Sequence, residues 1–146
     1  MRWSDNPAMK PLAFPLKILR YVWAAPCTAV GLVLAILLLI LGGSMRLKGG
    51  VLEVALRRGR RQLRFPISAI TFGHVVLGLN EQLLTQLRTH EFVHVRQYER
   101  WGLLFFLAYP ASSLWQWLVG KKPYWDNHFE VEARELSAPH RKNRPA

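Results

Sequence analysis

A long apolar run near the N-terminus dominates the hydropathy pattern. From about Tyr21 to Leu41 the chain is uncharged and almost wholly apolar. About 20 such residues cross the hydrocarbon core of a bilayer as one helix. Residues 21–43 are therefore predicted to form a transmembrane anchor, preceded by a basic, proline-containing arm over residues 1–20. A cleaved signal peptide ending near Gly42-Gly43-Ser44 is the alternative, but the lengths of the arm and of the apolar run favour an anchor.

The spacing of apolar residues changes to a period of two between Met45 and Leu79, which indicates strands. The alternation is clear over residues 51–56. Arg58-Gly59 follows and can turn the chain into a second run from Arg60 to Ile67. A further strand-like run covers residues 70–77. This pattern predicts a small antiparallel sheet of two or three strands.

An amphipathic helical pattern follows the strands. Asn80 is a good N-cap, and Glu81 lies in the first turn, where the helix dipole favours an acidic side chain. Apolar residues recur every three to four positions as far as Tyr98, and the same face becomes polar in its second half. The pattern predicts a helix whose first half packs into a core and whose second half lines a cleft.

A second apolar block runs from Trp101 to Val119. It is long enough to span a bilayer, but Pro110 and several polar residues interrupt it. One interpretation is a re-entrant hairpin broken at Pro110. The other, which we favour because each half is too short to cross, is an interfacial segment that belongs to the core of the domain. A short final helix is then predicted over residues 124–135, capped by Asp126 or Asn127.

These elements predict an α+β fold in which an N-terminal transmembrane helix precedes one small domain. The domain covers residues 44–136, including the apolar segment 101–119. The last residues, 137–146, are basic and are predicted to form a flexible tail.

Charge changes this picture by suggesting a partner. The 146 residues include 20 Lys+Arg and 9 Asp+Glu, which give a formal net charge of +11. Much of the positive charge lies beside the apolar blocks, so a lipid bilayer with anionic lipid is the expected partner. No nucleic-acid partner is expected, because the sequence has neither an aromatic-studded basic face nor a nucleic-acid-binding motif. The single cysteine, Cys27, excludes an internal disulfide.

The predicted helix after Asn80 contains His90-Glu91-Phe92-Val93-His94, which has the pattern H-E-x-x-H. Each helical residue turns by about 100°, so histidines four positions apart lie one turn apart on the same face. Two imidazoles in this arrangement can bind one metal ion, and Zn²⁺ is the expected metal. Glu91 lies close enough to take a proton from a water at that ion. The alternative is an amphipathic helix whose histidines merely face solvent.

Catalytic zinc usually has three protein ligands, so a third is expected after the motif. The candidates are the acidic and histidine side chains of the C-terminal segment: Asp126, His128, Glu130, Glu132, Glu135 and His140. Glu130 and Glu132 lie about 200° apart on a helix, so only one of them can face the metal. The residues alone leave that choice open.

The two motifs resemble those of the gluzincin metallopeptidases, and their layout is similar to small membrane-associated bacterial members of that group. The resemblance rests on His90 to His94 followed by Phe129-Glu130-Val131-Glu132-Ala133. It implies a zincin-like domain in which Glu130, the first glutamate of the second motif, is the third zinc ligand. Arg134 stands where many such families have an aspartate that orients a motif histidine, so the residue that supports this histidine is not assigned.

The expected function is that of a membrane-anchored zinc metallopeptidase in a bacterial inner membrane, acting on a peptide or protein substrate. Zinc held by His90, His94 and Glu130 would activate a water, and Glu91 would act as the general base. The rival hypothesis is a zinc protein without turnover, serving as a sensor, an adaptor or a structural site. The side of the membrane on which the domain lies is left open.

Three further residues are candidates for substrate contact or for support of the zinc ligands: His74, Glu132 and Tyr98. His74 could instead be an ordinary histidine at a sheet surface. The sheet edge over about residues 71–77 is expected to hold an extended peptide by strand addition. A shared zinc site also requires the block 101–119 to bring Glu130 back to the motif helix.

Overall fold

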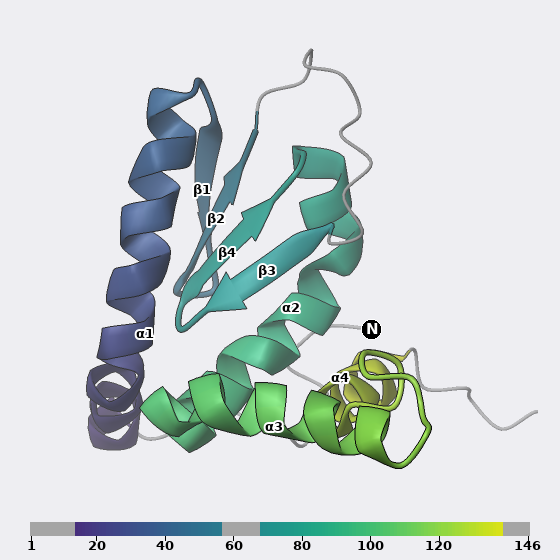
Figure 1. The fold of residues 1–146 in the computed structure, drawn as a ribbon. Coiled ribbons are helices and arrows are strands. Elements are labelled where there is room, and N and C mark those ends of the chain that lie inside the picture. The colour runs from purple at the N-terminus through teal and green to yellow at the C-terminus, as the bar shows by residue number, and fades with distance from the viewer. Residues whose placement is uncertain (1–13, 57–67, 139–146) are drawn as a thin grey trace, which may run out of the picture.

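The computed structural model describes residues 14–56 and 68–138. Its elements are α1 (Phe14–Ile40), β1 (Ser44–Lys48), β2 (Val51–Ala55), β3 (Ala69–Phe72), β4 (Val75–Gly78), α2 (Glu81–Trp101), the short 3₁₀ helix η3 (Gly102–Leu104), α3 (Phe105–Leu118) and α4 (His128–Ser137) (Figure 1). This composition confirms the predicted α+β class. The predicted turn at Arg58-Gly59, the run from Arg60 to Ile67 and nearly all of the predicted tail lie outside the described residues.

The sheet has four strands in the order β1-β2-β4-β3, so the prediction of two or three strands was wrong. Gly49 and Gly50, with φ of 57° and 82°, form the turn that separates β1 from β2. Gly73, with φ of 58°, splits the predicted run 70–77 into the hairpin of β3 and β4. The sheet is also not wholly antiparallel, because β2 pairs with β4 in parallel.

The sheet lies between α1 and α2 (Figure 1). Alternate residues of a strand point to opposite faces. β4 is apolar on both faces, and β2 is apolar except for Glu53, which is buried in an ion pair with Arg88 of α2. On one face, Ala35 of α1 packs in a cluster with Val54, Val75 and Leu77. On the other face, the α2 side chains pack in a second cluster, which contains Val51, Ala55, Val76, Leu84, Phe92 and Val95. The sheet is therefore covered on both faces.

Helix α1 begins at Phe14, so it includes part of the predicted basic arm. Pro15 fits there because the first turn of a helix needs no N–H donor. Among the described residues, α1 is the one helix that by length and composition could cross a membrane, a property it shares with signal sequences and core helices. Its buried residues are small and lie on one side: Ala24, Cys27, Gly31 and Ala35. A Cβ placed on Gly31 would lie 2.7 Å from the Cβ of Val75, so α1 packs closely on the sheet.

The second apolar block forms one helix and not a hairpin. α3 continues through Pro110, which removes one helix hydrogen bond without ending the helix. One side of α3 contacts α2 and α4, whereas large apolar side chains on its other side are exposed. The block thus packs against α2 and α4 with one side, and the chain after it returns to α2 through α4.

Two asparagines set the ends of the helices that carry the motifs. Asn80 accepts a hydrogen bond from the backbone N–H of Leu83 at 2.8 Å and caps α2 as predicted. Of the two caps considered for the last helix, Asn127 is the one observed, since its side chain accepts from the N–H of Phe129 at 2.9 Å. Helix α4 packs against α2, which brings the second motif to the first.

Candidate metal centre

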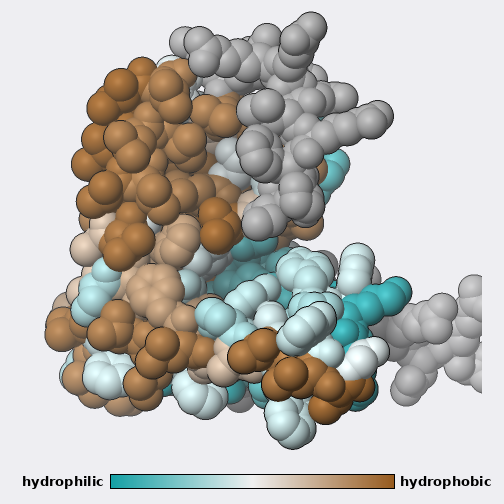
Figure 2. All heavy atoms as spheres, viewed as in Figure 1, coloured by the Kyte–Doolittle hydropathy of each residue, from teal (hydrophilic) through white to brown (hydrophobic). Residues whose placement is uncertain are grey.

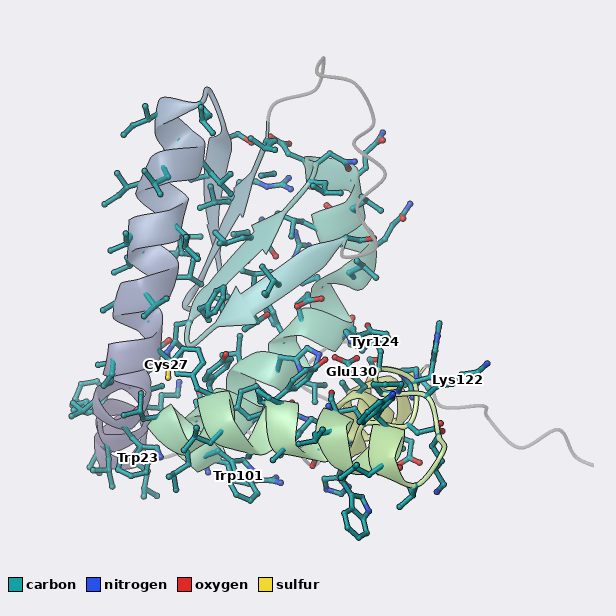
Figure 3. The ribbon with its side chains drawn as sticks, viewed as in Figure 1. Trp23, Cys27, Trp101, Lys122, Tyr124 and Glu130 are labelled. Carbon is teal, nitrogen blue, oxygen red and sulfur yellow. The ribbon has the colours of Figure 1, made fainter. Side chains whose placement is uncertain are left out.

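The site lies where α2, α3 and α4 meet, and Figure 3 shows Glu130 at this junction. His90 and His94 project from the second half of α2, and Glu130 lies in the first turn of α4. Figure 2 shows hydrophilic surface between the sheet and the layer formed by α3 and α4, in contrast to the hydrophobic surface over α1. The fold thus joins the two sequence motifs at one place.

Donor atoms of these three side chains converge there. The Nε2 atoms of His90 and His94 lie 3.2 Å apart. Glu130 places Oε2 3.2 Å from Nε2 of His90 and Oε1 3.3 Å from Nε2 of His94. A tetrahedral zinc with bonds of about 2.0–2.1 Å has ligand atoms about 3.3–3.4 Å apart. The 3.2 Å between the two nitrogens is close to this spacing, and each nitrogen lies a similar distance from one of the two Glu130 oxygens. Within the described residues this is the one group of three such side chains that could hold a metal ion.

One oxygen of Glu130 lacks a hydrogen bond in this arrangement. Glu130 is 3% exposed, and its Oε2 is buried without a hydrogen-bond partner, since the contact with His90 does not have hydrogen-bond geometry. A buried carboxylate oxygen left in this way is costly unless a cation or donor satisfies it. The unsatisfied oxygen is an observation, independent of the motif, that favours a bound cation.

The charges at the site also favour a cation. Burial alone would raise the pKa of the Glu130 carboxyl, but the His90 and His94 rings and the Tyr109 hydroxyl hold it well below its usual range. Burial lowers the pKa of His94, and the adjacent Glu130 carboxylate outweighs this and raises it in the metal-free protein. Glu130 is thus an anion across the physiological pH range, as a zinc ligand must be.

Two tyrosines border Glu130. The Tyr109 hydroxyl, from α3, donates to Oε1 of Glu130 at 2.6 Å, and burial together with this carboxylate raises the pKa of Tyr109 above its usual range. Tyr124 lies beside Glu130 (Figure 3), and partial burial followed by the nearby carboxylate raises its pKa to about 12. Both phenols keep their protons at neutral pH and can donate hydrogen bonds at the site.

Glu91 lies next to the three donors but is not part of their cluster. Its side chain is buried, and its Oε2 accepts a 2.7 Å hydrogen bond from the Thr71 hydroxyl. Thr71 belongs to β3, so the sheet fixes the orientation of this carboxylate. Glu91 is therefore held in place by the sheet and is not one of the grouped donors.

Gln97 orients one of the histidines. Its amide nitrogen donates to the carbonyl of Phe129 at 2.9 Å and to Oε2 of Glu132 at 2.8 Å. Neither of these partners can donate, so the amide oxygen must face His94, whose Nδ1 lies 2.8 Å away. Nδ1 of a neutral His94 then carries the proton, and the lone pair of Nε2 points toward Glu130.

This network separates the two glutamates of the second motif. Glu130 faces the histidines, whereas Glu132 bonds Gln97 and accepts from Arg100 at 3.1 Å. The structure thus places Glu132 as a support of Gln97. Arg134 packs over Trp125, with its guanidinium 5.2 Å from the ring centre. The residue that bonds the motif histidine, which the sequence did not assign, is Gln97.

Two predicted site residues lie elsewhere. His74 is buried in the β3–β4 turn, so it is not a histidine at a sheet surface. Its Nε2 lies 3.1 Å from Glu99, and its ring stacks on Tyr21 with centres 3.8 Å apart. Tyr98 packs in a buried apolar cluster with Phe105 and other residues. Both residues join α1 and α2 and stay outside the cluster of metal donors.

Sequence reasoning missed three residues of this site: Thr71, Gln97 and Tyr109. Gln97 had a signal, because it lies three residues after His94 and so on the same face of the helix. Thr71 and Tyr109 had none, since their roles depend on contacts between elements. Tyr109 in particular is one hydroxyl within an apolar run.

Comparisons with protein-family models, with curated proteins and with solved structures found no match for this chain. The resemblance to gluzincins therefore rests on the two short motifs. The function has to be argued from the geometry of the site.

Proposed function

We propose that this chain is a membrane-anchored, zinc-dependent metallopeptidase with His90, His94 and Glu130 as zinc ligands. The observation that carries the proposal is the convergence of these three side chains. The two Nε2 atoms lie 3.2 Å apart, and each lies 3.2 or 3.3 Å from a different oxygen of Glu130, one of which has no hydrogen-bond partner. Two histidines and one glutamate, with a fourth position left to water, form a donor set of catalytic zinc sites.

Each residue of the site has a role in this proposal. Zinc in such sites lowers the pKa of water and polarises a carbonyl group. Glu91 accepts the proton of the attacking water and passes it to the leaving amine. The Thr71 hydroxyl keeps the Glu91 carboxylate in place for both transfers. The protonated hydroxyl of Tyr124 is available to donate to the oxygen on which charge develops.

Strand β3 offers a place for the substrate. In the described sheet β3 has β4 on one side only, whereas β4 lies between β2 and β3. Of the segment 71–77 that was expected to bind an extended peptide, the part in β3 is therefore the part that lies at an edge of the described sheet. An extended peptide added to this edge would lie beside Thr71 and Glu91, since these two residues are hydrogen-bonded.

The proposal is tested by measuring zinc content and peptide cleavage together, with and without a chelator. The wild type is compared with Glu91→Gln, and with Glu135→Gln as a control that makes the same change at an exposed residue of α4. We expect zinc in all three chains and cleavage that the chelator abolishes. Glu91→Gln should keep its zinc and lose about 10²–10⁴-fold in rate, because the general base is lost.

Other results would separate the alternatives. Zinc in the wild type without any cleavage that depends on Glu91 would support a sensor, adaptor or structural site. A wild type that binds no zinc would overturn the proposal.

A further inference from the structure

The two carboxylate oxygens of Glu130 have different surroundings. Oε1 accepts a 2.6 Å hydrogen bond from the hydroxyl of Tyr109 on α3, whereas Oε2 is buried and has no hydrogen-bond partner. Nε2 of His90 lies 3.2 Å from Oε2, and Nε2 of His94 lies 3.3 Å from Oε1. Each oxygen is therefore equally close to one histidine, and the Tyr109 hydroxyl is what distinguishes the two oxygens.

The number of oxygens that Glu130 gives to a metal decides whether the site is open. A catalytic zinc takes three protein ligands and keeps its fourth position for water. His90 and His94 supply two of these ligands, so one carboxylate oxygen completes the set. Carboxylates can also bind a metal through both oxygens. Both oxygens together would give four protein donor atoms and would close a four-coordinate site.

Tyr109 is fixed to the start of α4 through its backbone as well as through its hydroxyl. The side-chain amide of Asn127, which is fully buried, donates to the Tyr109 carbonyl at 3.0 Å and to the Ser113 hydroxyl at 2.7 Å. The same Asn127 caps the helix that carries Glu130. The Tyr109 ring lies nearly parallel to that of Phe129, with centres 6.2 Å apart. Contacts at the carbonyl, the ring and the hydroxyl thus hold Tyr109 against Glu130.

The bond between Tyr109 and Oε1 is of a strong type. Hydroxyl-to-carboxylate bonds of about 2.5–2.7 Å are roughly twice as strong as bonds between neutral groups. A tyrosine hydroxyl has one proton to donate, and this bond uses it. Moving Oε1 to a metal would weaken the bond, whereas Oε2 has no bond to lose.

We infer that Tyr109 is a positioning residue that holds Oε1 of Glu130 and leaves Oε2 as the one atom that this side chain offers to a metal. The inference rests on the proposed function, since it concerns the same site. With Oε1 held, Glu130 is a ligand through a single atom and the fourth position stays free for water. Tyr109 thus acts through the ligand and not by contact with the substrate.

The test removes the hydroxyl and keeps the ring. Tyr109→Phe is compared with the wild type and with Tyr98→Phe, which makes the same change at a buried tyrosine outside the metal centre. Each full-length chain is loaded with cobalt(II) as the probe, because the visible absorption of cobalt depends on the number of its ligands. Metal content is measured, circular dichroism checks the fold, and titration with a hydroxamate measures access to the open position.

We expect one cobalt in each of the three chains. Tyr109→Phe should differ from the other two in its cobalt absorption, because the freed Oε1 becomes a further ligand. Its affinity for the hydroxamate, and its rate of peptide cleavage when loaded with zinc, should fall by about 10–100-fold, the usual cost of losing a group that orients a ligand.

Three results would overturn the inference. A folded Tyr109→Phe chain with the wild-type spectrum and hydroxamate affinity would do so and would leave the proposed function intact. A folded Tyr109→Phe chain that loses its metal would show that the hydroxyl is needed for binding and not for the choice of oxygen. A wild type that binds no cobalt, or whose cobalt does not take the hydroxamate, would overturn the inference and the proposed function together, whatever the variants do.

Discussion

At the scale of single residues, Gln97 fixes which ring nitrogen of His94 is free to bind a metal. The Gln97 amide cannot turn over, because its oxygen would then face the Phe129 carbonyl and the Glu132 carboxylate. Its orientation is fixed from α4, and through it the protonated nitrogen of His94 is fixed as well. The same helix that supplies Glu130 thus orients His94 for binding.

We expect Gln97→Met to lower zinc affinity by about 10–100-fold, the usual cost of losing the group that orients a ligand. Methionine keeps the volume but cannot accept from Nδ1 of His94. Affinity is measured by competition with a chelator, and the folded state is checked by circular dichroism. Gln86→Met, at an exposed position of the same helix, is the control. A folded Gln97→Met chain with wild-type affinity would show that Gln97 does not orient the ligand.

The sequence predicted the residues whose roles depend on local spacing. His90, Glu91 and His94 follow from one helix, and the structure brings the two histidines together with Glu130. The choice between Glu130 and Glu132 required the position of Gln97 across the α2–α4 contact. Contacts of this kind join residues far apart in the chain, and helical periodicity carries no information about them.

At the scale of elements, α1 packs close to the sheet because the residues on its inner face are small. A Cβ on Gly31 would lie 2.7 Å from Val75 Cβ and 2.9 Å from the Phe72 carbonyl, which belongs to the backbone and cannot move aside easily. Close packing of a helix on a sheet therefore depends on this glycine. The opposite side of α1 tolerates large residues because nothing in the described domain packs on it.

Gly31→Leu is expected to destabilise the protein by about 1–3 kcal/mol or more, since overpacking forces the helix away from the sheet. Val33→Leu, a change on the exposed side of α1, should stay within about 0.5 kcal/mol of the wild type. Denaturant unfolding of both variants in the same detergent gives the comparison. Equal stability of the two would mean that α1 does not pack on the sheet.

The hydropathy pattern predicted which segments form helices and strands, but it did not predict how the strands pair. The cap at Asn80 marked the start of α2, because a cap is a local feature. A period of two indicated strands, but it could not show that Gly73 turns one run into two strands or that β2 lies parallel to β4. A proline inside a helix removes one hydrogen bond and crowds the preceding turn, so the sequence suggested a break at Pro110, but α3 continues through it.

At the scale of the whole molecule, α3 lies between the metal centre and an exposed apolar surface. Tyr109 on the inner side of α3 contacts Glu130, whereas Leu107 and Leu114 are exposed on the same helix. A helix with its side chains is about 10–12 Å thick. The metal centre thus lies within about one helix diameter of this exposed apolar surface.

If the proposed peptidase works at a membrane that the exposed side of α3 contacts, a peptide attached to a lipid headgroup should be cleaved faster than the same peptide in solution. The bilayer confines both partners to one surface, and tethering of this kind raises apparent affinity by about 10²–10⁴-fold. The comparison uses kcat/KM for both peptides in vesicles that carry the protein, with Glu91→Gln as the blank. Equal values would show that membrane docking does not present the substrate.

The central claim is an open zinc site formed by His90, His94 and Glu130, and X-ray absorption at the zinc edge tests it most directly. We predict one zinc per chain, bound by two imidazole nitrogens and by oxygen at about 2.0–2.1 Å, with a spectrum that changes when a hydroxamate occupies the open position. Glu130→Gln should alter this spectrum, whereas Glu132→Gln should not. Two results would contradict the account: a chain without stoichiometric zinc, or a zinc with four protein ligands whose spectrum does not change when the hydroxamate is added.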